Sequence, residues 1–343
     1  MNIKQLHKFL TQKKFKFHRI FIFLLIFLLM TNFFIFKVNV TDENADFEIL
    51  NGMTITLLSR SLENQGLIPS AWRLKMLFYI SGNQNRIKKG NYRIKKGSTS
   101  LDLLRMITQG KETTHAITFV EGTTFNDALE IIKNNENIKQ TLPSKIDESE
   151  LLKVLEAEEP YLEGVIYPDT YYFVKNTSDV ELLKKSYQTL KRKLKLAWQH
   201  RANNLPYKNE YEALIMASII EKEVTFYDEA PQVSGVFVNR LNKGMRLQTD
   251  PTVIYGMRAT FDGNIRKKDL KQDNPYNTYT RYGLPPSPIS LVSYKSLNAA
   301  LNPATTKALY FVAMGNSRHY FSQTLDEHNE AVNKYQRKIE SKK

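Results

Sequence analysis

Residues 211–223 read Tyr-Glu-Ala-Leu-Ile-Met-Ala-Ser-Ile-Ile-Glu-Lys-Glu, and this stretch decides how the surrounding domain has to fold. From Ala213 to Ile220 every residue except Ser218 is apolar, so no face of a helix here suits contact with water. A helix that is apolar all round is buried, and other elements must pack around it. The sequence therefore predicts a central buried helix within a mixed α+β domain.

Glu221 is the candidate catalytic residue of this helix. One stripe at helical spacing holds Leu214, Ala217, Ser218 and Glu221. Burial and the negative end of the helix dipole both favour the neutral form of a carboxyl group at this position. A neutral carboxylic acid is what protonation of a glycosidic leaving group requires. On the helix alone, the alternative is that Glu221 is ion-paired or is the first solvated residue beyond a core helix.

Three loops rich in polar and aromatic residues follow the helix within about forty residues. They are Gln248-Thr-Asp-Pro-Thr252, Asn274-Pro-Tyr-Asn-Thr-Tyr279 and Gly283-Leu-Pro-Pro-Ser-Pro-Ile289. Amides, hydroxyls and flat aromatic faces together suit the recognition of sugar rings and their hydroxyl groups. We therefore expect the substrate sugars to be bound by Gln248, Asp250, Tyr276, Asn277 and Tyr279.

The segment before the central helix supplies further supporting candidates. Residues 147–203 are predicted to be helical, with one interruption at residues 162–172 that combines Gly, Pro and three tyrosines. That composition is typical of an ordered loop or short strand that lines a cleft. Glu163 and Asp169, which lie in the interruption, are expected to support the site, as is Ser218 of the helix.

Glu223 is expected to have a supporting role that is separate from that of Glu221. Residues i and i+2 of a helix point roughly 200° apart, so the two carboxyl groups cannot act as a pair across one bond. We therefore expect Glu223 to support the end of the helix or a neighbouring loop.

One local pattern recurs three times in the N-terminal half of the chain, as Gly52-Met-Thr54, Gly97-Ser-Thr99 and Gly122-Thr-Thr124. Apolar residues at helical spacing follow each copy, so each copy is predicted to introduce a helix. The threonine caps the first turn of the helix, and the glycine allows the tight turn that precedes it. Any strand–turn–helix unit gives this pattern. The more specific interpretation is a small LysM-like α/β module at residues 47–113, of a kind that binds glycan chains.

The N-terminal residues predict a membrane anchor. Residues 1–20 contain six Lys and Arg residues and no acid, and the run from Ile20 to Phe36 is apolar except for Thr31 and Asn32. We expect a cytoplasmic basic tail at residues 1–17 and a single transmembrane helix at residues 18–38 in the cell (inner) membrane, with the rest of the chain outside the cytoplasm. The alternative, a cleaved signal peptide, needs a shorter apolar core and a small-residue cleavage site.

The composition argues against several other classes of protein. Part of the net charge of +14 belongs to the basic tail, and the remainder shows no cluster interleaved with aromatics, so a nucleic-acid partner is not expected. The absence of Cys excludes zinc ribbons, iron–sulfur sites and thiol nucleophiles. The six His residues lack the i, i+4 pairing of zinc ligands, and we expect no metal or other cofactor.

Five motifs in this order resemble those of the YceG-like family, at residues 163–171, 217–223, 236–256, 276–279 and 283–289. The resemblance extends from the anchor to near the C-terminus. It implies a single-pass anchor, a LysM-like module and a YceG-like catalytic domain at residues 114–343. It also implies that the catalytic glutamate of the Ala-Ser-Ile-Ile-Glu-Lys-Glu motif is Glu221.

The resemblance further implies an endolytic peptidoglycan lytic transglycosylase. Such an enzyme cleaves the β-1,4 bond between N-acetylmuramic acid and N-acetylglucosamine in nascent glycan strands and leaves a 1,6-anhydro-muramic end. A single carboxyl group suffices, because the C6 hydroxyl of the substrate is the nucleophile. Close tethering to the membrane would make the enzyme a terminator of strand elongation, with a glycan-polymerising synthase as a plausible partner. The alternatives are a non-catalytic wall-binding scaffold and a hydrolytic muramidase.

Overall fold

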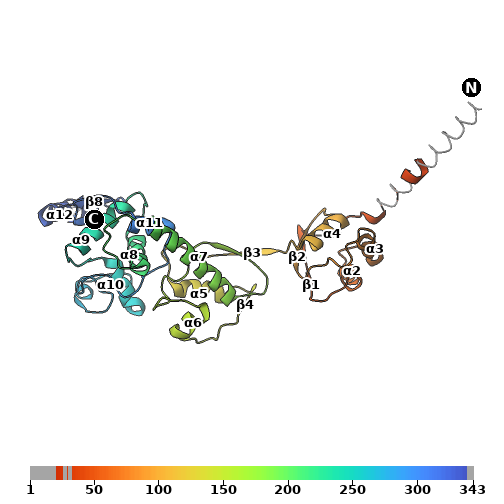
Figure 1. Ribbon diagram of the computed structural model, residues 1–343, viewed down its shortest axis with the longest axis horizontal. Coiled ribbons are helices and arrows are strands. Elements are labelled where there is room, and N and C mark those ends of the chain that lie inside the picture. Colours follow the sequence, from red (N-terminus) through yellow and green to blue (C-terminus); the bar gives the residue numbers. More distant parts are fainter. Residues whose placement is uncertain (1–20, 26–28, 30–32, 338–343) are drawn as a thin grey trace, which may run out of the picture. The chain divides into compact units, whose positions relative to one another are not determined.

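The computed structural model describes residues 21–25, 29 and 33–337, and it divides into two compact units (Figure 1). The first unit ends at His115 and the second begins at Ala116, whereas the sequence predicted a boundary between residues 113 and 114. Each unit combines helices with short two-stranded sheets.

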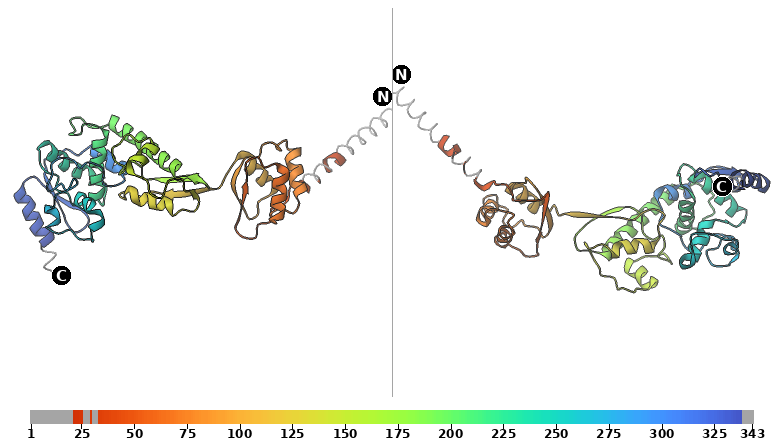
Figure 2. Two further views of the ribbon diagram at one scale, coloured as in Figure 1. Left: turned by 90° about the horizontal axis from the view of Figure 1, so that it is seen from below. Right: turned by 180° about the vertical axis from the view of Figure 1, so that it is seen from behind.

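The folded part of the first unit, among the residues that the structure describes, combines an antiparallel sheet with helices, which Figure 2 shows from two further sides. In chain order the elements are β1 (Asn44–Ile49), α2 (Ile55–Asn64), α3 (Ala71–Ile80), β2 (Gly90–Lys95) and α4 (Ser100–Gln109). Strands β1 and β2 pair with Phe47 opposite Tyr92, and these two rings stack at 5.6 Å. Both rings belong to the core of this unit, together with Leu58, Leu74 and Ile107.

The three repeated Gly-x-Thr turns start helices, as predicted. Thr54 caps α2, Thr99 caps α4, and Thr124 caps α5 (Phe125–Lys133) in the second unit, each by accepting a hydrogen bond from a backbone N–H of the first turn. At Thr99 and Thr124 an aspartate three residues later completes a capping box. The sequence signal was strong here because a cap depends on residues close together in the chain.

The N-terminal segment joins the first unit earlier than the sequence predicted. Within the described residues helical structure ends at Phe34, and residues 35–40 are extended with alternate side chains buried. Phe36, Val38 and Val40 pack in the core of the first unit, and the N–H of Val38 donates to the carbonyl of Ser98 at 2.9 Å. The predicted transmembrane helix at residues 18–38 therefore extends too far, because its last residues are needed in this core.

Much of the predicted basic tail and transmembrane helix lies outside the described residues, namely residues 1–20, 26–28 and 30–32. In the part of the chain that the structure describes, no helix has both the length and the hydropathy needed to cross a membrane.

The second unit is larger and mostly helical. Besides α5 its main elements are β3 (Thr114–Thr118), β4 (Ile138–Lys139), α6 (Glu148–Leu155), β5 (Thr170–Val174), β6 (Thr177–Ser178), α7 (Asp179–Gln199), α8 (Glu210–Glu223), α9 (Ala230–Asn242), α10 (Asp250–Met257), α11 (Tyr294–Leu301), β7 (Tyr310–Ala313), β8 (His319–Ser322) and α12 (Leu325–Val332). Three short turns of helix complete it, at Arg258–Thr260, Asp269–Lys271 and Asn333–Arg337. The strands pair as β3 with β5, β4 with β6, and β7 with β8.

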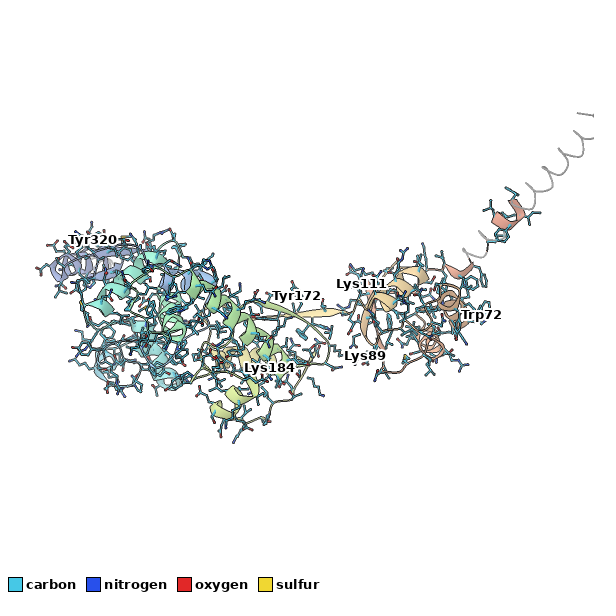
Figure 3. The ribbon with its side chains drawn as sticks, viewed as in Figure 1. Trp72, Lys89, Lys111, Tyr172, Lys184 and Tyr320 are labelled. Carbon is cyan, nitrogen blue, oxygen red and sulfur yellow. The ribbon has the colours of Figure 1, made fainter. Side chains whose placement is uncertain are left out.

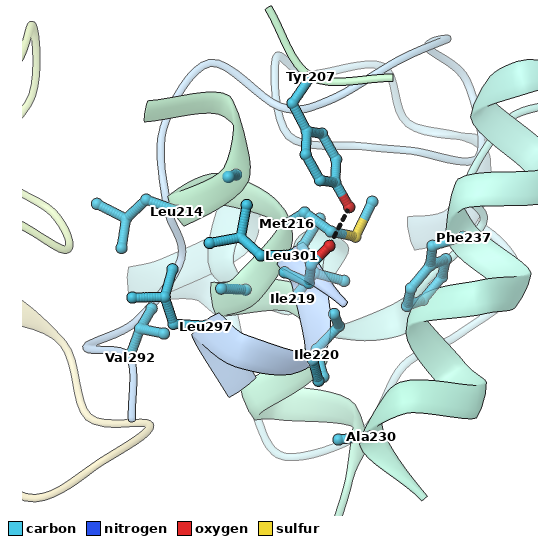
Figure 4. Close-up of a cluster of buried hydrophobic side chains, with 14 of the residues drawn as sticks. Tyr207, Leu214, Met216, Ile219, Ile220, Ala230, Phe237, Val292, Leu297 and Leu301 are labelled. Atoms are coloured by element: carbon cyan, nitrogen blue, oxygen red, sulfur yellow. Dashed lines mark hydrogen bonds between the residues drawn. The ribbon is translucent and has the colours of Figure 1, made fainter. Parts of the chain in front are cut away.

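Helix α8 is the centre of this unit, and the prediction that it is buried on every side is confirmed. All residues from Ala213 to Glu221 are buried, and α8 packs against α7, α9, α10 and α11. Figure 4 shows part of this core, where the hydroxyl of Tyr207 donates to the carbonyl of Ala300 at 3.2 Å. Because α8 is enclosed by four helices, only its C-terminal end is placed to carry chemistry.

Candidate active site

Glu221 joins two helices through its carboxyl group. Its side chain is 9% exposed, and its Oε1 accepts a hydrogen bond from the hydroxyl of Tyr227 at 2.5 Å. Its Oε2 accepts from the N–H of Ser293 at 2.9 Å and from the hydroxyl of the same residue at 2.6 Å. Ser293 is the N-cap of α11, so the carboxyl group of Glu221 ties the end of α8 to the start of α11.

Ser218, one turn earlier, makes the matching connection on the same stripe of α8. Its hydroxyl accepts from the N–H of Ile289 at 2.9 Å and donates to the carbonyl of Ile215 at 2.7 Å. The hydroxyl of Ser290 donates to the carbonyl of Ser218. The stripe that the sequence marked is thus the contact between α8 and residues 289–293, and Ser218 supports that contact.

Glu223, the last residue of α8, has the surroundings of a general acid. Its Oε1 accepts a hydrogen bond from the hydroxyl of Thr249, and its Oε2 has no hydrogen-bond partner among the described residues. The pKa of Glu223 is raised to about 7, mainly by burial and to a smaller extent by the charge of Asp250, against the opposing effect of the Thr249 hydrogen bond. A carboxyl group with a pKa near neutrality can hold a proton and release it during a reaction.

Glu223 lines a cavity of about 490 Å³, a size typical of ligand pockets. Three of the predicted sugar-binding residues, Gln248, Asp250 and Tyr279, line the same cavity. Glu221 is not one of the described residues that line it. The remaining walls come from α9, the loop before α10, β7, β8, α12 and the turn after α12, through Arg240, Leu247, Tyr310, Phe311, Val312, Ala313, His319, Leu325, His328, Val332 and Gln336.

The loop before α10 holds the polar wall of this cavity in place. The N–H of Gln248 donates to the carbonyl of Thr278, and the N–H of Thr249 donates to the hydroxyl of the same residue. The hydroxyl of Tyr279 donates to Oδ1 of Asp250 at 2.6 Å. Burial and the neighbouring carboxylate raise the pKa of Tyr279, so its hydroxyl keeps the proton that orients Asp250.

Arg240 of α9 supports the same loop and has few N–H groups left to donate to a ligand. Its guanidinium donates to the carbonyls of Leu309, Arg246 and Leu247 and to the side-chain oxygen of Gln248. Because Arg240 is buried, these bonds are needed to compensate its charge for the loss of water. The sequence placed this arginine within the motif at residues 236–256 but gave no sign that its side chain is buried.

Tyr276 and Asn277 make structural contacts within the loops that follow α10. Asn277 is 0% exposed, and its amide group donates to the carbonyls of three residues and accepts from a backbone N–H, which occupies it completely. The hydroxyl of Tyr276 pairs with that of Ser287 at 2.7 Å, and its ring packs edge-on against Tyr255. Both side chains hold residues 269–287 in shape. Asn277 has no exposed surface for a sugar, so its predicted sugar contact is corrected, whereas that of Tyr276, which is partly exposed, stays a prediction.

The two acidic residues of the interruption before α7 lie apart from the cavity of Glu223. Glu163 is buried, and its oxygens accept from the N–H of Phe125 and from the hydroxyl of Tyr255. Burial raises the pKa of Glu163 to about 7. Asp169 is exposed and accepts a hydrogen bond from the N–H of Thr170. Glu163 therefore supports α5 and α10, whereas Asp169 has no described contact with either Glu221 or Glu223.

A second cavity of about 480 Å³ lies beside α10 in the second unit. Glu163, Lys222, Pro251 and Tyr255 are among the residues that line it. Neighbouring residues thus face different cavities, since Lys222 lines the second and Glu223 the first. In the described part of the chain, no group of three or more His, Asp or Glu side chains could hold a metal ion.

Sequence reasoning missed Thr249, Tyr227, Ser293 and Arg240. Thr249 lies inside a loop that the sequence did mark, between Gln248 and Asp250, so its neighbours were the available signal. Tyr227 and Ser293 reach Glu221 only in the folded chain, and Ser293 lies 72 residues away from it. Contacts of this kind leave no pattern in the local sequence from which they could have been predicted.

A half-buried carboxylic acid in a cavity lined by amide, carboxylate and tyrosine side chains is typical of a site that cleaves glycosidic bonds. The sequence matches the YceG-like family over residues 47–334. Because this match covers most of the chain, the protein belongs to the YceG-like family.

Named relatives and a solved structure agree with this assignment. The endolytic murein transglycosylase of Bacillus subtilis (strain 168) is 31% identical over 320 residues, and the match covers 86% of each chain. The endolytic murein transglycosylase of Streptococcus pneumoniae strain R6 is 25% identical, and the match covers 83% of this chain but 57% of that protein. A crystal structure of a yceG-like protein from Listeria monocytogenes is 28% identical with a TM-score of 0.50, covering 84% of this chain and 99% of that one.

Proposed function

We propose that this protein is an endolytic peptidoglycan lytic transglycosylase in which Glu223 is the catalytic acid and base. The observation that carries the assignment of Glu223 is its position. It is the carboxyl group of the family motif that lines the same cavity as Gln248, Asp250 and Tyr279. Its raised pKa and its unpartnered Oε2 support the same role. The proposal moves the catalytic role from Glu221, whose three hydrogen bonds belong to the junction of α8 and α11.

The reaction needs one carboxyl group and no water. Protonated Glu223 donates its proton to the bridging oxygen of N-acetylglucosamine as the bond from that oxygen to C1 of the muramic residue breaks. The carboxylate of Glu223 then takes the proton of the muramic C6 hydroxyl as its oxygen bonds to C1. The products are a free 4-hydroxyl group and a 1,6-anhydro end. Asp250, oriented by Tyr279, places negative charge near the positive charge that develops at C1.

One observation favours a second candidate, the hydrolytic muramidase. Asp250 gives the cavity a second carboxyl group, and two carboxyl groups across the scissile bond are what hydrolytic glycosidases use. A wall-binding scaffold without turnover is less well supported, because binding alone does not require a carboxyl group with a pKa near neutrality.

Mass analysis of the products from uncrosslinked glycan strands tests these alternatives. A lytic transglycosylase releases fragments with anhydro ends, which are lighter by one water than the reducing ends left by a muramidase. Fragments with reducing ends would replace the proposal by hydrolysis through Glu223 and Asp250. Binding without any fragments would support the scaffold.

The proposal includes the location of the enzyme. The six basic residues of the first twenty and the apolar run after them support a single-pass anchor with the N-terminus in the cytoplasm. A reporter fused after Lys343 is then active outside the cytoplasm. Activity of the reporter only inside the cell would refute the orientation. Anchoring near the membrane supports the finer proposals that the enzyme terminates strand elongation and meets a glycan-polymerising synthase on the same strand.

The first unit is proposed to bind glycan as a LysM-like module. A cavity of about 830 Å³ lies between the turn that enters α2 and the loop that leaves α3. Asn51, Thr54, Tyr79, Gln84 and Asn85 line it, and these side chains suit sugar hydroxyls. Binding of soluble glycan strands by the chain, weakened by Asn85→Ala and unchanged by Glu223→Gln, tests this assignment separately from catalysis.

A further inference from the structure

We propose that Trp72 lies in the headgroup region of the membrane and holds the first unit directly against the lipid surface. The proposal rests on the membrane anchor of the preceding section, although it concerns a different part of the chain from the active site. The interaction surface is formed by Phe33, Ile35, Lys37, Trp72 and Arg73, which we call the aromatic edge.

The aromatic edge exposes large apolar side chains beside the proposed anchor. Trp72, the second residue of α3, is 57% exposed and lies at the surface of the first unit (Figure 3). Its ring lies 6.2 Å from that of Phe33 and 6.1 Å from that of Phe34. Phe33 is itself 50% exposed. Exposed aromatic rings in contact with each other are costly in water, and a partner that covers them is therefore expected.

Arg73 fixes the end of the N-terminal helix to α3. Its Nε donates to the carbonyl of Phe33 at 2.7 Å, and its second nitrogen donates to the same oxygen. The guanidinium also lies over the ring of Phe33 at 4.6 Å and over that of Phe36 at 4.8 Å. Arg73 therefore caps the carbonyl of Phe33 at the end of the helix. Because Trp72 is the neighbour of Arg73 in the chain, the depth of Phe33 in the membrane also sets the depth of Trp72.

The length of the apolar run places that point in the membrane interface. Within the described residues helical structure ends at Phe34, only 14 positions after the apolar run of the sequence begins at Ile20, whereas a helix that spans a membrane needs about 20 residues. The hydrocarbon core of a bilayer is about 30 Å thick, so the outer end of so short a span is drawn into the interface. The first unit begins at that end without a linker, because Phe36, Val38 and Val40 already belong to its core.

The chemistry of the aromatic edge matches lipid headgroups better than it matches a protein partner. Tryptophan is enriched where membrane and water meet, since its ring is apolar and its N–H needs a polar partner. Lys37 is exposed and Arg73 is half-buried at the same edge, and each adds attraction to anionic headgroups. The partner that we infer is therefore the outer surface of the anionic membrane that holds the anchor.

Depth-dependent quenching of tryptophan fluorescence tests the proposal. The chain has two tryptophans, so Trp198→Phe leaves Trp72 as the sole emitter. The full chain is reconstituted into phosphatidylethanolamine–phosphatidylglycerol vesicles whose lipids carry bromine either near the headgroup or deep in the acyl chain. We expect blue-shifted emission and quenching at least about twofold stronger with the shallow bromine than with the deep one. Trp72→Phe, which keeps Trp198, is the matched control and loses this difference.

Three outcomes would overturn the proposal. Unquenched Trp72 in protein that floats with the vesicles would leave the anchor intact and place α3 in water. Protein that does not float with the vesicles would refute the membrane anchor and with it this proposal. Cleavage of soluble strands by the same protein would show separately whether the proposed enzymatic function holds. Cross-linking of two chains through position 72 would assign the aromatic edge to a second copy. If Trp198→Phe does not fold, the difference in quenching between the unaltered chain and Trp72→Phe gives the same reading.

Discussion

At the scale of single residues, two carboxyl groups separated by one lysine have opposite surroundings. Glu221 receives three hydrogen bonds and connects α8 with α11, whereas Glu223 receives one and lines a cavity. Replacement of the carboxyl group by an amide should therefore affect activity at Glu223 and stability at Glu221.

Replacement of Glu223 by Gln is expected to abolish cleavage without loss of stability. The amide oxygen still accepts from Thr249, but the transferable proton is gone, so turnover falls by about 10²–10⁴-fold or more. Because burial raises the pKa of Glu223 to about 7 from an ordinary 4.5, its ionised form costs stability as the pH rises through that range. The melting temperature of the variant at pH 8 is then equal to or above that of the unaltered chain.

Replacement of Glu221 by Gln is the matched comparison. The NH₂ group of the new glutamine would face Tyr227 or Ser293, which donate hydrogen bonds to the carboxylate of Glu221. Because two donors then oppose each other, we expect a loss of about 1–3 kcal/mol in the free energy of unfolding. The rate of glycan cleavage and the thermal unfolding of both variants, measured side by side, separate the catalytic role from the structural one. Full stability and zero activity in Glu221→Gln, with an active Glu223→Gln, would return the catalytic role to Glu221.

The pH dependence of cleavage should show the titration of Glu223. The reaction begins with the protonated acid, so kcat/KM declines about tenfold per pH unit above the pKa of about 7. Glu163 has a pKa raised to a similar value but lies in the second cavity, so Glu163→Gln should leave the declining limb in place. Profiles measured from pH 5 to 9 for both proteins decide this, and a limb that disappears in Glu163→Gln would contradict the assignment.

At the scale of elements, the loop of residues 269–279 is held together by one side chain. The amide nitrogen of Asn277 donates to the carbonyls of Asp269, Leu270 and Gln272, and its oxygen accepts from the N–H of Tyr279. The shape of the cavity wall thus depends on a residue that does not line it.

Replacement of Asn277 by Ala is expected to destabilise the fold by about 2–4 kcal/mol, because several buried backbone groups lose their partner. Chemical denaturation measures the effect. Tyr279→Phe removes the hydroxyl that orients Asp250 and should reduce turnover with little change in stability. An Asn277→Ala variant of unaltered stability and weakened glycan binding would instead support the direct sugar contact that the sequence predicted.

At the scale of the whole molecule, the chain consists of two compact units whose connection passes near residues 113–116. The first unit begins immediately after the apolar run, with Phe36 and Val38 in its core. The proposed tether between membrane and catalytic unit is therefore a folded module, and not a flexible linker.

A long flexible insert after Thr113 should change the length of the glycan products. The insert leaves the cores of both units intact, since the N–H of Thr113 still donates to the carbonyl of Asn91 in the first unit. If the first unit limits the reach of the active site from the membrane, the insert variant leaves longer strands attached to the membrane. Size analysis of membrane-linked strands checks this, and an unchanged distribution would mean that the cavity or a partner sets the length.

The sequence by itself determined the features that depend on neighbours in the chain. Apolar residues on all sides predicted a buried α8, and threonines at Gly-x-Thr turns predicted three helix caps. The motifs also identified the family and the polar loops near the site. Three of the five predicted sugar-binding residues line the cavity of Glu223.

Only the tertiary structure decided which side of α8 faces the cavity. A helix that is apolar all round has no polar face to indicate the direction of the active site. The choice of Glu221 over Glu223 therefore rested on a stripe of the helix that, in the structure, contacts residues 289–293. The same limit applies to Asn277 and to Phe36, because the identity of an amide or a phenylalanine does not reveal whether its partners are water, sugar, lipid or distant parts of the chain. Those partners come together only when α9, α11 and the loops pack around α8.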